Sequence, residues 1–386
     1  ALIELNKIVV GSKNKSIVNE SLFLIAEIYE STQQIEKAES IYLQLLSEES
    51  NSSPYIREKS LEKLASIYKL NGNWTKALEF YKKLINQYSN TDTAKANIVN
   101  YLESFYQLKD YNAIINNGRS LLKTYPEATN QSDIMLMMAK AYYELQIISE
   151  VELLLNQIKN KYPESIAYST SLELQIRLIK KNGGIEAAIN EINKSLKKQI
   201  SRTTEEVLYS LLLDCQIELN QLTEAEKTAK LLINKFNLST NLSYYYWQWV
   251  KLNALLKTPA QVLKEREKIN TILKNTTYEN WASLYMAMNY SNANELFLAL
   301  SLLQDLDAKV QEPELKYEIY CLRAAIYEKQ ENYTAQLNEL KYLTQYYSFL
   351  GNNAKLFAEI AKVYQKHYQD PSQAILFYSQ ALAQSH

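Results

Sequence analysis

The sequence predicts an all-α protein built as a solenoid of about ten helix–turn–helix repeats. Three observations support this fold class. The 386 residues include only six glycines and six prolines, which argues against β-rich folds and flexible linkers. Small and large apolar residues recur at helical spacing. The unit that they define returns mostly every 37 residues, as it does from Ala65 to Leu102 and on to Ala139.

The stretches 22–45 and 61–84 show the repeating unit most clearly. In each, a large apolar residue is followed four residues later by alanine and three residues after that by tyrosine. After a turn, the pattern Ala-x3-Tyr-x2-Leu follows. The matching positions are Leu22, Ala26, Tyr29, Ala38, Tyr42 and Leu45, then Leu61, Ala65, Tyr68, Ala77, Tyr81 and Leu84. Because two helices cross closely where small residues meet, this pattern predicts two packed helices per unit.

The close-packing position recurs along nearly the whole chain. In the first helices it falls at Ala26, Ala65, Leu102, Ala139, Ile176, Leu213, Val250, Ala287, Ala324 and Ala361. In the second helices it falls at Ala38, Ala77, Ile114, Val151, Ala188, Ala225, Val262, Ala299 and Gln336, and at Ala374 in a last repeat with one extra residue. A period held over this length indicates stacked helix pairs that share one continuous core.

Several local signals predict where helices begin and end. Thr223 and Glu226 have the spacing of a capping box at a second helix. Thr258 and Asp370 each precede a proline, which predicts a cap residue followed by proline at the first helical position. Pro126 and Pro163 stand at matching positions, where we expect second helices to have just ended.

The unit resembles the tetratricopeptide repeat (TPR). This resemblance implies a right-handed superhelix whose inner groove binds protein partners. The period exceeds the usual TPR length of about 34 residues, and the surplus lies in the linkers "KTYPEATNQSD" and "NKYPESIAYST", and more loosely in "NQYSNTDTA". These linkers are similar to those of bacterial envelope TPR proteins such as the outer-membrane-assembly lipoprotein and the Tol–Pal accessory protein.

The linkers and the Lys-, Asn-, Ile- and Tyr-rich composition favour a bacterial periplasmic scaffold. A similar role is known for the TPR proteins that build the periplasmic disks and cages of Campylobacter-type flagellar motors. The alternative is a cytoplasmic adaptor or regulator, with which two unpaired cysteines are also compatible.

The two ends of the chain look unfinished. We expect residues 1–386 to form a single solenoid domain, with about ten repeats over 19–386. Residues 1–12 have the apolar spacing of a second helix, which predicts a repeat whose first helix lies upstream in a longer protein. At the other end, "ILFYSQALAQSH" has no polar capping helix after it. These ends favour the second alternative, a structural element that assembles through its solenoid ends.

No motif in the sequence predicts catalysis, a cofactor or a metal site. His367 is expected in an exposed loop and His386 is terminal, while Cys215 and Cys321 should lie roughly 30 Å apart, because they are about three repeats apart and neighbouring helices pack 8–10 Å from each other. The net charge of −1 gives no reason to expect nucleic acid. No apolar run approaches the roughly 20 residues of a membrane span. The sequence therefore predicts a protein-binding scaffold, not an enzyme.

The stretch "SYYYWQWV", residues 243–250, is the most aromatic part of the chain. Within the repeat pattern, Tyr246, Trp249 and Val250 are core positions. The neighbouring positions face the groove, and they predict an apolar partner site over repeats seven to nine. Its expected residues are Tyr244, Trp247, Lys251, Trp281, Leu284 and Met288, with Ala254, Leu255, Cys321 and Ala325 beside them. The alternative is that a tightly wound superhelix buries these rings against its own neighbours.

Charged residues are expected to line the groove elsewhere. Repeat one contributes Glu20, Glu27 and Glu30, and repeat five contributes Arg177, Lys180 and Lys181. Each set can be a solvated helix face. The basic set is also a candidate site for an acidic segment of a partner.

Overall fold

The computed structural model describes residues 1–126, 130–351 and 353–384. The chain divides into two compact units, Ala1–Asn182 (unit 1) and Gly183–His386 (unit 2). Every regular element of the described residues is helical.

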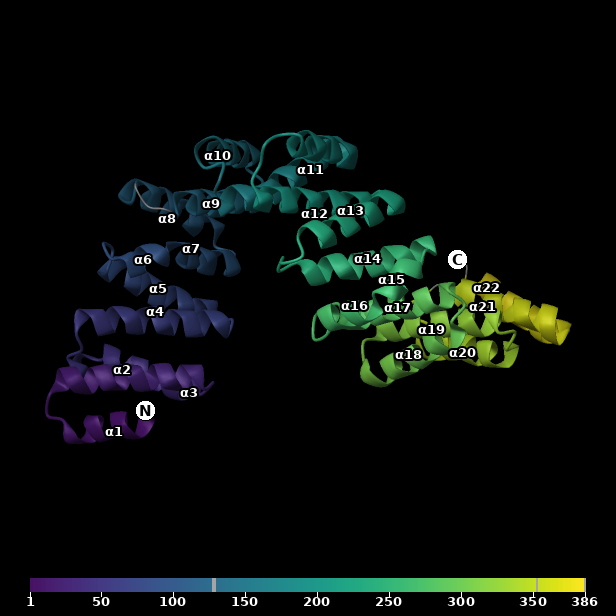
Figure 1. Cartoon of the computed structure of the whole chain (residues 1–386), viewed down its shortest axis with the longest axis horizontal. Helices are drawn as coiled ribbons and strands as arrows, with labels where there is room; N and C mark the ends of the chain where they lie inside the picture. Colours follow the sequence, from purple (N-terminus) through teal and green to yellow (C-terminus); the bar gives the residue numbers. More distant parts are fainter. Residues whose placement is uncertain (127–129, 352, 385–386) are drawn as a thin grey trace. The chain divides into compact units, whose positions relative to one another are not determined.

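Unit 1 is a series of helix pairs in which each pair packs on the next (Figure 1). After α1 (Leu2–Gly11), the first helices of its repeats are α2 (Lys15–Ser31), α4 (Pro54–Leu70), α6 and α7 together (Asp92–Ala96 and Ile98–Gln107), α9 (Gln131–Glu144) and the beginning of α11 (Ile166–Leu196). The second helices are α3 (Ile35–Leu46), α5 (Trp74–Gln87), α8 (Tyr111–Thr124) and α10 (Ile148–Lys161), and a short 3-10 turn, η1 (Glu48–Ser50), precedes α4. Apolar side chains from α2 through α11 form one core cluster.

Unit 2 continues the same alternation after the end of α11. Its first helices are α12 (Arg202–Glu218), α14 (Leu242–Leu256), α17 (Glu279–Asn292), α19 (Pro313–Lys329) and α21 (Asn353–Val363). Its second helices are α13 (Leu222–Lys235), α15 and α16 together (Ala260–Lys264 and Arg266–Leu273), α18 (Leu296–Lys309), α20 (Tyr333–Tyr346) and α22 (Pro371–Ala383), and the π-helical turn η2 (Tyr364–Tyr368) follows α21. The two helices of a repeat contact each other, as α12 and α13, α17 and α18, and α21 and α22 do, and α13 also contacts α14 of the next repeat.

The predicted close-packing positions are buried in every repeat. In unit 1, Ala26, Ala65, Leu102 and Ala139 of the first helices are 0% exposed, as are the matching residues of α3, α5, α8 and α10. In unit 2, the exposure at these positions does not exceed 4%, and the polar Gln336 occupies one of them. The sequence pattern therefore identified the crossing points of the helices, and the all-α helical-repeat fold is confirmed.

The turn inside each repeat contains a left-handed residue that the sequence analysis missed. In nine repeats, the residue five positions before the close-packing site of the second helix has a positive φ; these residues are Gln33, Gly72, Lys109, Gln146, Asn220, Lys257, Asn294, Glu331 and Gln369. Only one of them is glycine, although a Cβ destabilises this conformation. In α11, Gly184 instead adopts φ 82° and ψ 175°, a conformation that is essentially restricted to glycine.

Replacing Glu331 with glycine should stabilise the protein by about 0.5–1 kcal/mol. The φ of Glu331 is 58°, so the substitution removes a left-handed Cβ, and this gain exceeds the added entropy of the unfolded chain. The measurement is the midpoint of guanidinium unfolding. Glu331→Ala, which keeps the Cβ, is the control and should not stabilise. Gly72→Ala at the equivalent turn should lower the midpoint, and a rise there would contradict the explanation.

Two of the predicted helix caps are wrong. Gln221, not Thr223, precedes α13, and the carboxylate of Glu226 accepts a hydrogen bond from Trp249 Nε1 instead of closing a capping box. Thr258 donates its hydroxyl to Asn253 Oδ1, and α15 begins at Ala260. In both cases a partner from another helix or turn competes with the local cap.

The Asp370 cap is confirmed, because its side chain accepts from the backbone N–H of Gln373 and Pro371 opens α22. Asn73, Asp110 and Asn332 are equivalent caps that the sequence analysis did not use. Each stands four residues before the close-packing site, as Asp370 does, so their common offset was a usable signal.

Both Tyr-Pro linkers follow second helices, as predicted: α8 ends at Thr124 and α10 at Lys161. Gln131 ties the two linkers together at the beginning of α9. Its Nε2 donates to the backbone carbonyl of Tyr125 at 2.8 Å, and its Oε1 accepts from the Tyr162 hydroxyl at 3.2 Å. Residues 127–129 of the first linker lie outside the described residues.

Candidate binding surfaces

In unit 2, the first helices α14 and α17, with the residue that precedes α17, bring four aromatic side chains and one lysine together. The ring of Trp247 stacks on Tyr278, with centroids 5.2 Å apart and an interplanar angle of 18°. The Tyr244 ring lies 6.1 Å from Trp247 and 5.9 Å from Tyr278. The ammonium of Lys251 lies 5.4 Å from the Trp247 centroid and 5.8 Å from that of Tyr285. We call Tyr244, Trp247, Lys251, Tyr278 and Tyr285 the aromatic strip.

The aromatic strip is half-buried and held in place from below. Its rings pack against the core cluster that contains Trp249 and Val250. The hydroxyl of Tyr244 donates to the carboxylate of Asp214 on α12. Burial and then this carboxylate raise the pKa of Tyr244, so the hydroxyl remains protonated and keeps donating at neutral pH. The rings therefore have a fixed arrangement before any partner binds.

The structure separates the predicted groove residues into three groups. Tyr244, Trp247 and Lys251 lie together in the aromatic strip. Trp281 and Met288 are half-buried on α17, and Trp281 packs against the next core cluster. Leu284 is only 5% exposed and is a member of that cluster. Leu284 is therefore a core residue and not part of an exposed groove.

Tyr278 was missed by the sequence analysis. It precedes α17 and lies nine residues before Ala287. Because it stands before the helix, the spacing of residues along the helix did not identify it. The core prediction for this stretch is confirmed, since Tyr246 and Val250 are 0% exposed and Trp249 is 1% exposed. Tyr245, which was not assigned, is also fully buried and donates to Glu206 at 2.9 Å.

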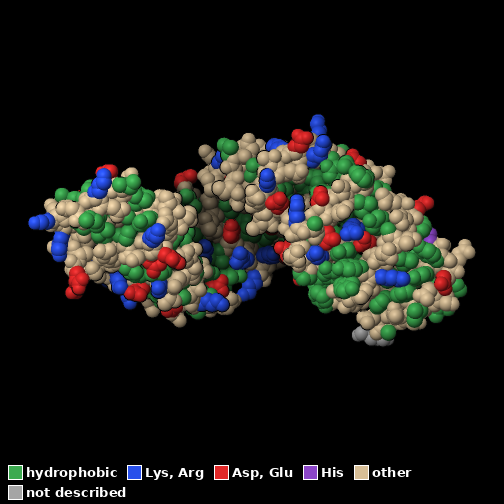
Figure 2. All heavy atoms as spheres, turned by 90° about the horizontal axis from the view of Figure 1, so that it is seen from below, with side chains coloured by type: hydrophobic (Ala, Val, Ile, Leu, Met, Phe, Trp, Pro, Cys, Tyr) green, Lys and Arg blue, Asp and Glu red, His purple; other side chains and the backbone are tan. Residues whose placement is uncertain are grey.

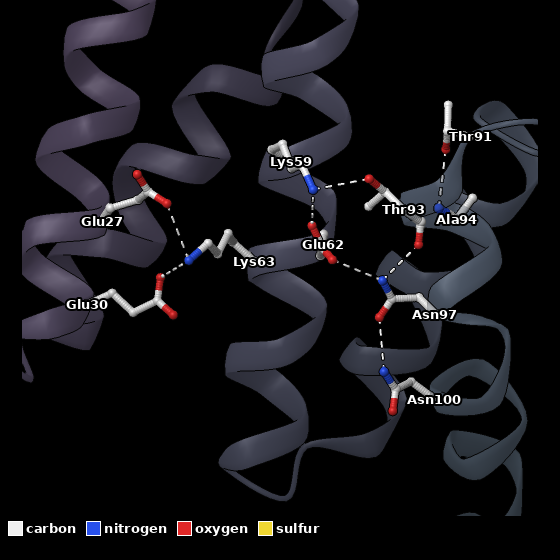
Figure 3. Close-up of polar contacts among 10 residues, drawn as sticks. All are labelled: Glu27, Glu30, Lys59, Glu62, Lys63, Thr91, Thr93, Ala94, Asn97 and Asn100. Carbon is white, nitrogen blue, oxygen red and sulfur yellow. Dashed lines mark hydrogen bonds and ion pairs between the residues drawn. The ribbon is translucent and has the colours of Figure 1, made fainter.

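The corresponding face of unit 1 is polar, and its charges are mostly paired between neighbouring helices (Figure 3). Lys63 of α4 lies between Glu27 and Glu30 of α2, at 3.5 and 3.1 Å. Lys59 pairs with Glu62 at 2.9 Å, and Glu62 in turn accepts from Asn97 at 3.1 Å. The acidic cluster expected in repeat one is therefore partly neutralised by the next repeat.

Farther along unit 1, a pocket of about 280 Å³ opens over α7, α9 and the beginning of α11. Its lining residues are Glu103, Tyr106, Gln107, Met137, Lys140, Tyr143, Glu144, Thr170, Glu173, Leu174 and Arg177. The Tyr106 hydroxyl donates to Glu144 at 3.1 Å, and burial together with this carboxylate raises the pKa of Tyr106 to about 12. The pocket contains charges of both signs.

The predicted basic set is only partly present at this pocket. Arg177 belongs to the lining, whereas Lys180 and Lys181 do not. Lys181 instead donates to Gln146 Oε1 at 2.7 Å. The three cations of the basic set therefore do not all line this pocket, and Arg177 is the member that does.

His367 and the two cysteines all lie in helical elements. His367 lies in the π-helical turn η2 and stacks on Tyr333 with a centroid distance of 3.5 Å, so it is not in a loop as expected. His386 lies outside the described residues. Cys215 is buried in α12 and Cys321 is half-buried in α19, and burial raises the pKa of Cys321 to about 11.

Within the described residues, no cluster of three or more metal-ligating side chains is found. The helices of the described ranges include none with both the length and the apolar content needed to cross a membrane. In the view of Figure 2, acidic and basic side chains are interspersed on each unit.

Comparison with known proteins gives both a sequence match and structural similarities. The tetratricopeptide-repeat family model matches residues 20–52 and 59–91. A TPR protein structure from Parabacteroides merdae is 12% identical with a TM-score of 0.45, covering 66% of this chain and 93% of that one. A human IFIT1 dimer with PPP-AAAA is 14% identical with a TM-score of 0.36, covering 99% and 94%. The Naa15/Naa10 structure bound to HypK-THB is 16% identical with a TM-score of 0.34, covering 100% and 60%.

No curated protein matches the sequence. The family match covers the first two full repeats of unit 1, α2 to α3 and α4 to α5. Their close-packing positions return in the later repeats of both units, where they are again buried. The TPR match therefore covers two repeats of unit 1, and the later repeats share their packing pattern.

Proposed function

We propose that this protein is a protein-binding scaffold and that the aromatic strip of unit 2 binds an apolar segment of a partner. The observation that supports this most is the preformed stack of Trp247 and Tyr278 across two neighbouring first helices. Rigid aromatic anchors lose little conformational entropy on binding, and Trp and Tyr dominate the binding energy of many interfaces. Lys251 extends the strip to Tyr285 with a charge that stays at the surface.

A random peptide display selection on the immobilised chain tests this proposal. Peptides enriched on the wild type should bind Trp247→Ala at least tenfold more weakly, since truncating a central aromatic anchor costs about 2 kcal/mol or more. Tyr278→Ala removes the other half of the stack and should act in the same direction. Phe297→Ala is the matched control, because Phe297 is 80% exposed on the second helix α18.

Circular dichroism and thermal melting must first show that the strip variants remain folded. If folded Trp247→Ala and Tyr278→Ala bind the enriched peptides as the wild type does, the aromatic strip is not the binding site. The solenoid ends would then be the next surface to test, in line with the structural alternative.

We further propose a bacterial periplasmic setting, in which such a scaffold would serve an envelope assembly such as a motor or an outer-membrane machine. The support is the resemblance of the Tyr-Pro linkers together with the composition of the chain. The hydrogen bonds of Gln131 give these linkers a packing role as well. Fractionation of the full-length gene product decides the question, and recovery in the cytoplasm would favour the adaptor alternative.

A further inference from the structure

The second helix α22 of unit 2 (yellow in Figure 1) has apolar side chains on two of its sides. Ala374 and Ala381 are 4% and 9% exposed and lie on the side that packs on α21. One residue after each of them stand Ile375 and Leu382, which are 66% and 70% exposed. Together with Ser379, which lies between them and is also exposed, we call these residues the outer stripe of α22.

The two apolar positions of the outer stripe are buried in earlier second helices. Ile115 and Leu337 occupy its first position and are each 6% exposed, while Ile85 and Ile233 occupy its last position and are 7% and 6% exposed. In those repeats a following first helix packs on the second helix, as α9 does on α8 and α21 does on α20. Among the described residues, α22 contacts chiefly α21 and η2. The outer stripe therefore has the side chains of a surface on which a helix packs.

The middle of the outer stripe is small in α22 alone. Five residues after the close-packing site, where α22 has Ser379, the second helices of the earlier repeats carry Leu43, Lys82, Arg119, Asn156, Asn193, Lys230, Glu267, Gln304 and Lys341. A large residue, a small one four positions on and a large one three positions later is also the pattern of the first helices, as in Leu61, Ala65 and Tyr68. Because helices cross closely where small residues meet, Ser379 marks a crossing point on the exposed side of α22.

The helix α22 carries no charged side chain from Pro371 to Ala383. A helix of 13 residues with the average charged content of this chain, 22%, would carry about three. In a two-fold contact between identical chains, each surface meets its own copy, so a charged stripe would place like charges together. An uncharged stripe with a central small residue is compatible with itself and has no charge with which to select an oppositely charged partner. A second copy of this chain is therefore the occupant that fits it.

We propose that two copies of this chain associate through α22, with the two helices crossing antiparallel at Ser379. Consecutive helices joined by short turns run antiparallel, so the second α22 takes the place that a following first helix has in the earlier repeats. Ile375 of one copy then packs beside Leu382 of the partner subunit, and the contact is isologous. This interface goes beyond the proposed function, because the aromatic strip belongs to other helices.

Sedimentation velocity of the full chain from about 1 to 200 µM tests the association, since a single helix crossing is at the small end of specific interfaces. The wild type should show a concentration-dependent dimer. Ile375→Glu combined with Leu382→Glu should weaken dimerisation at least tenfold, because it brings four carboxylates into one apolar contact. Phe297→Glu is the matched control, since Phe297 is 80% exposed on the second helix α18, and circular dichroism and thermal melting show that each variant is folded.

Two further variants test the geometry of the crossing. Ile375→Lys combined with Leu382→Glu pairs opposite charges in an antiparallel contact, so it should dimerise more strongly than the variant with two glutamates. Under mild oxidation, Ser379→Cys should form a disulfide between two chains, whereas Ser301→Cys, at an exposed serine of α18, should not. A monomer at every concentration, or a dimer that the two glutamates do not weaken, would overturn this inference and leave the proposed function standing.

Discussion

Replacing Trp249 with alanine is expected to destabilise unit 2 by about 3–5 kcal/mol. Trp249 is 1% exposed and meets Tyr246 edge-on at 6.2 Å. Its indole N–H donates to the Glu226 carboxylate at 2.8 Å, which joins α14 to α13. The alanine variant loses this apolar burial and also leaves a part-buried carboxylate without its best donor. The midpoint of guanidinium unfolding, followed by circular dichroism, measures the effect.

Two substitutions separate the causes of this effect. Trp249→Phe keeps most of the apolar volume and removes the N–H, so it should fall between the wild type and Trp249→Ala. Trp247→Ala removes a half-buried ring that stands three residues before the buried Val250. This substitution should cost about 1–2 kcal/mol. If Trp247→Ala unfolds the protein and Trp249→Ala does not, the core and surface faces of α14 have been exchanged.

The periodic part of the fold could be predicted from the sequence because it depends on spacing alone. Ala65 and Ala77 mark a crossing of two helices, and any chain segment with the same spacing must bury the equivalent positions to pack in the same way. Val250 and Ala287 show that the rule holds even in the repeats whose other residues depart from the pattern, since both are 0% exposed. The separation of core and surface aromatics in residues 243–250 follows from the same spacing.

The details that depend on contacts between repeats could not be predicted in this way. Thr223 and Glu226 have the spacing of a capping box, but a buried indole from the next repeat offers Glu226 a donor that outweighs the local one. Tyr278 joins the aromatic strip from outside a helix, where periodicity carries no information. The left-handed turn residues vary from Gln to Asn to Glu, because the closure of each helix pair fixes their backbone whatever the side chain.

A charged network between α18, α19 and α20 also depends on contacts between helices that periodicity does not reveal. Arg323 of α19 lies 3.5 Å from Asp307 of α18 and 2.6 Å from Glu339 of α20. Lys316 is a second partner of Asp307, at 3.5 Å. The Glu339 side chain is 9% exposed and that of Arg323 is 22% exposed. Burial raises the pKa of the Glu339 carboxyl, and the nearby guanidinium opposes this rise.

Arg323→Met should therefore destabilise unit 2 by roughly 2–4 kcal/mol at neutral pH, because it leaves the buried carboxylate of Glu339 without its cation. Without the guanidinium, the pKa of Glu339 rises further in the folded protein. A group whose pKa is higher in the folded state loses its contribution to stability as the pH increases through that pKa. The stability deficit of Arg323→Met relative to the wild type should thus shrink as the pH is lowered from 7.5 towards 5, because protonation of Glu339 removes the unpaired charge.

Denaturant midpoints measured across this pH range, with Glu339→Gln introduced into both backgrounds, test the explanation. The neutral amide should recover much of the stability of Arg323→Met at pH 7.5 and should remove most of the pH dependence of the deficit. Arg323→Lys keeps the charge without the planar fork and should cost less than Arg323→Met. A deficit that is equal at pH 5 and 7.5, and that Glu339→Gln does not relieve, would mean that Arg323 stabilises α19 through its stacking on Tyr320, whose ring centroid lies 5.2 Å from the guanidinium carbon, and not through its charge.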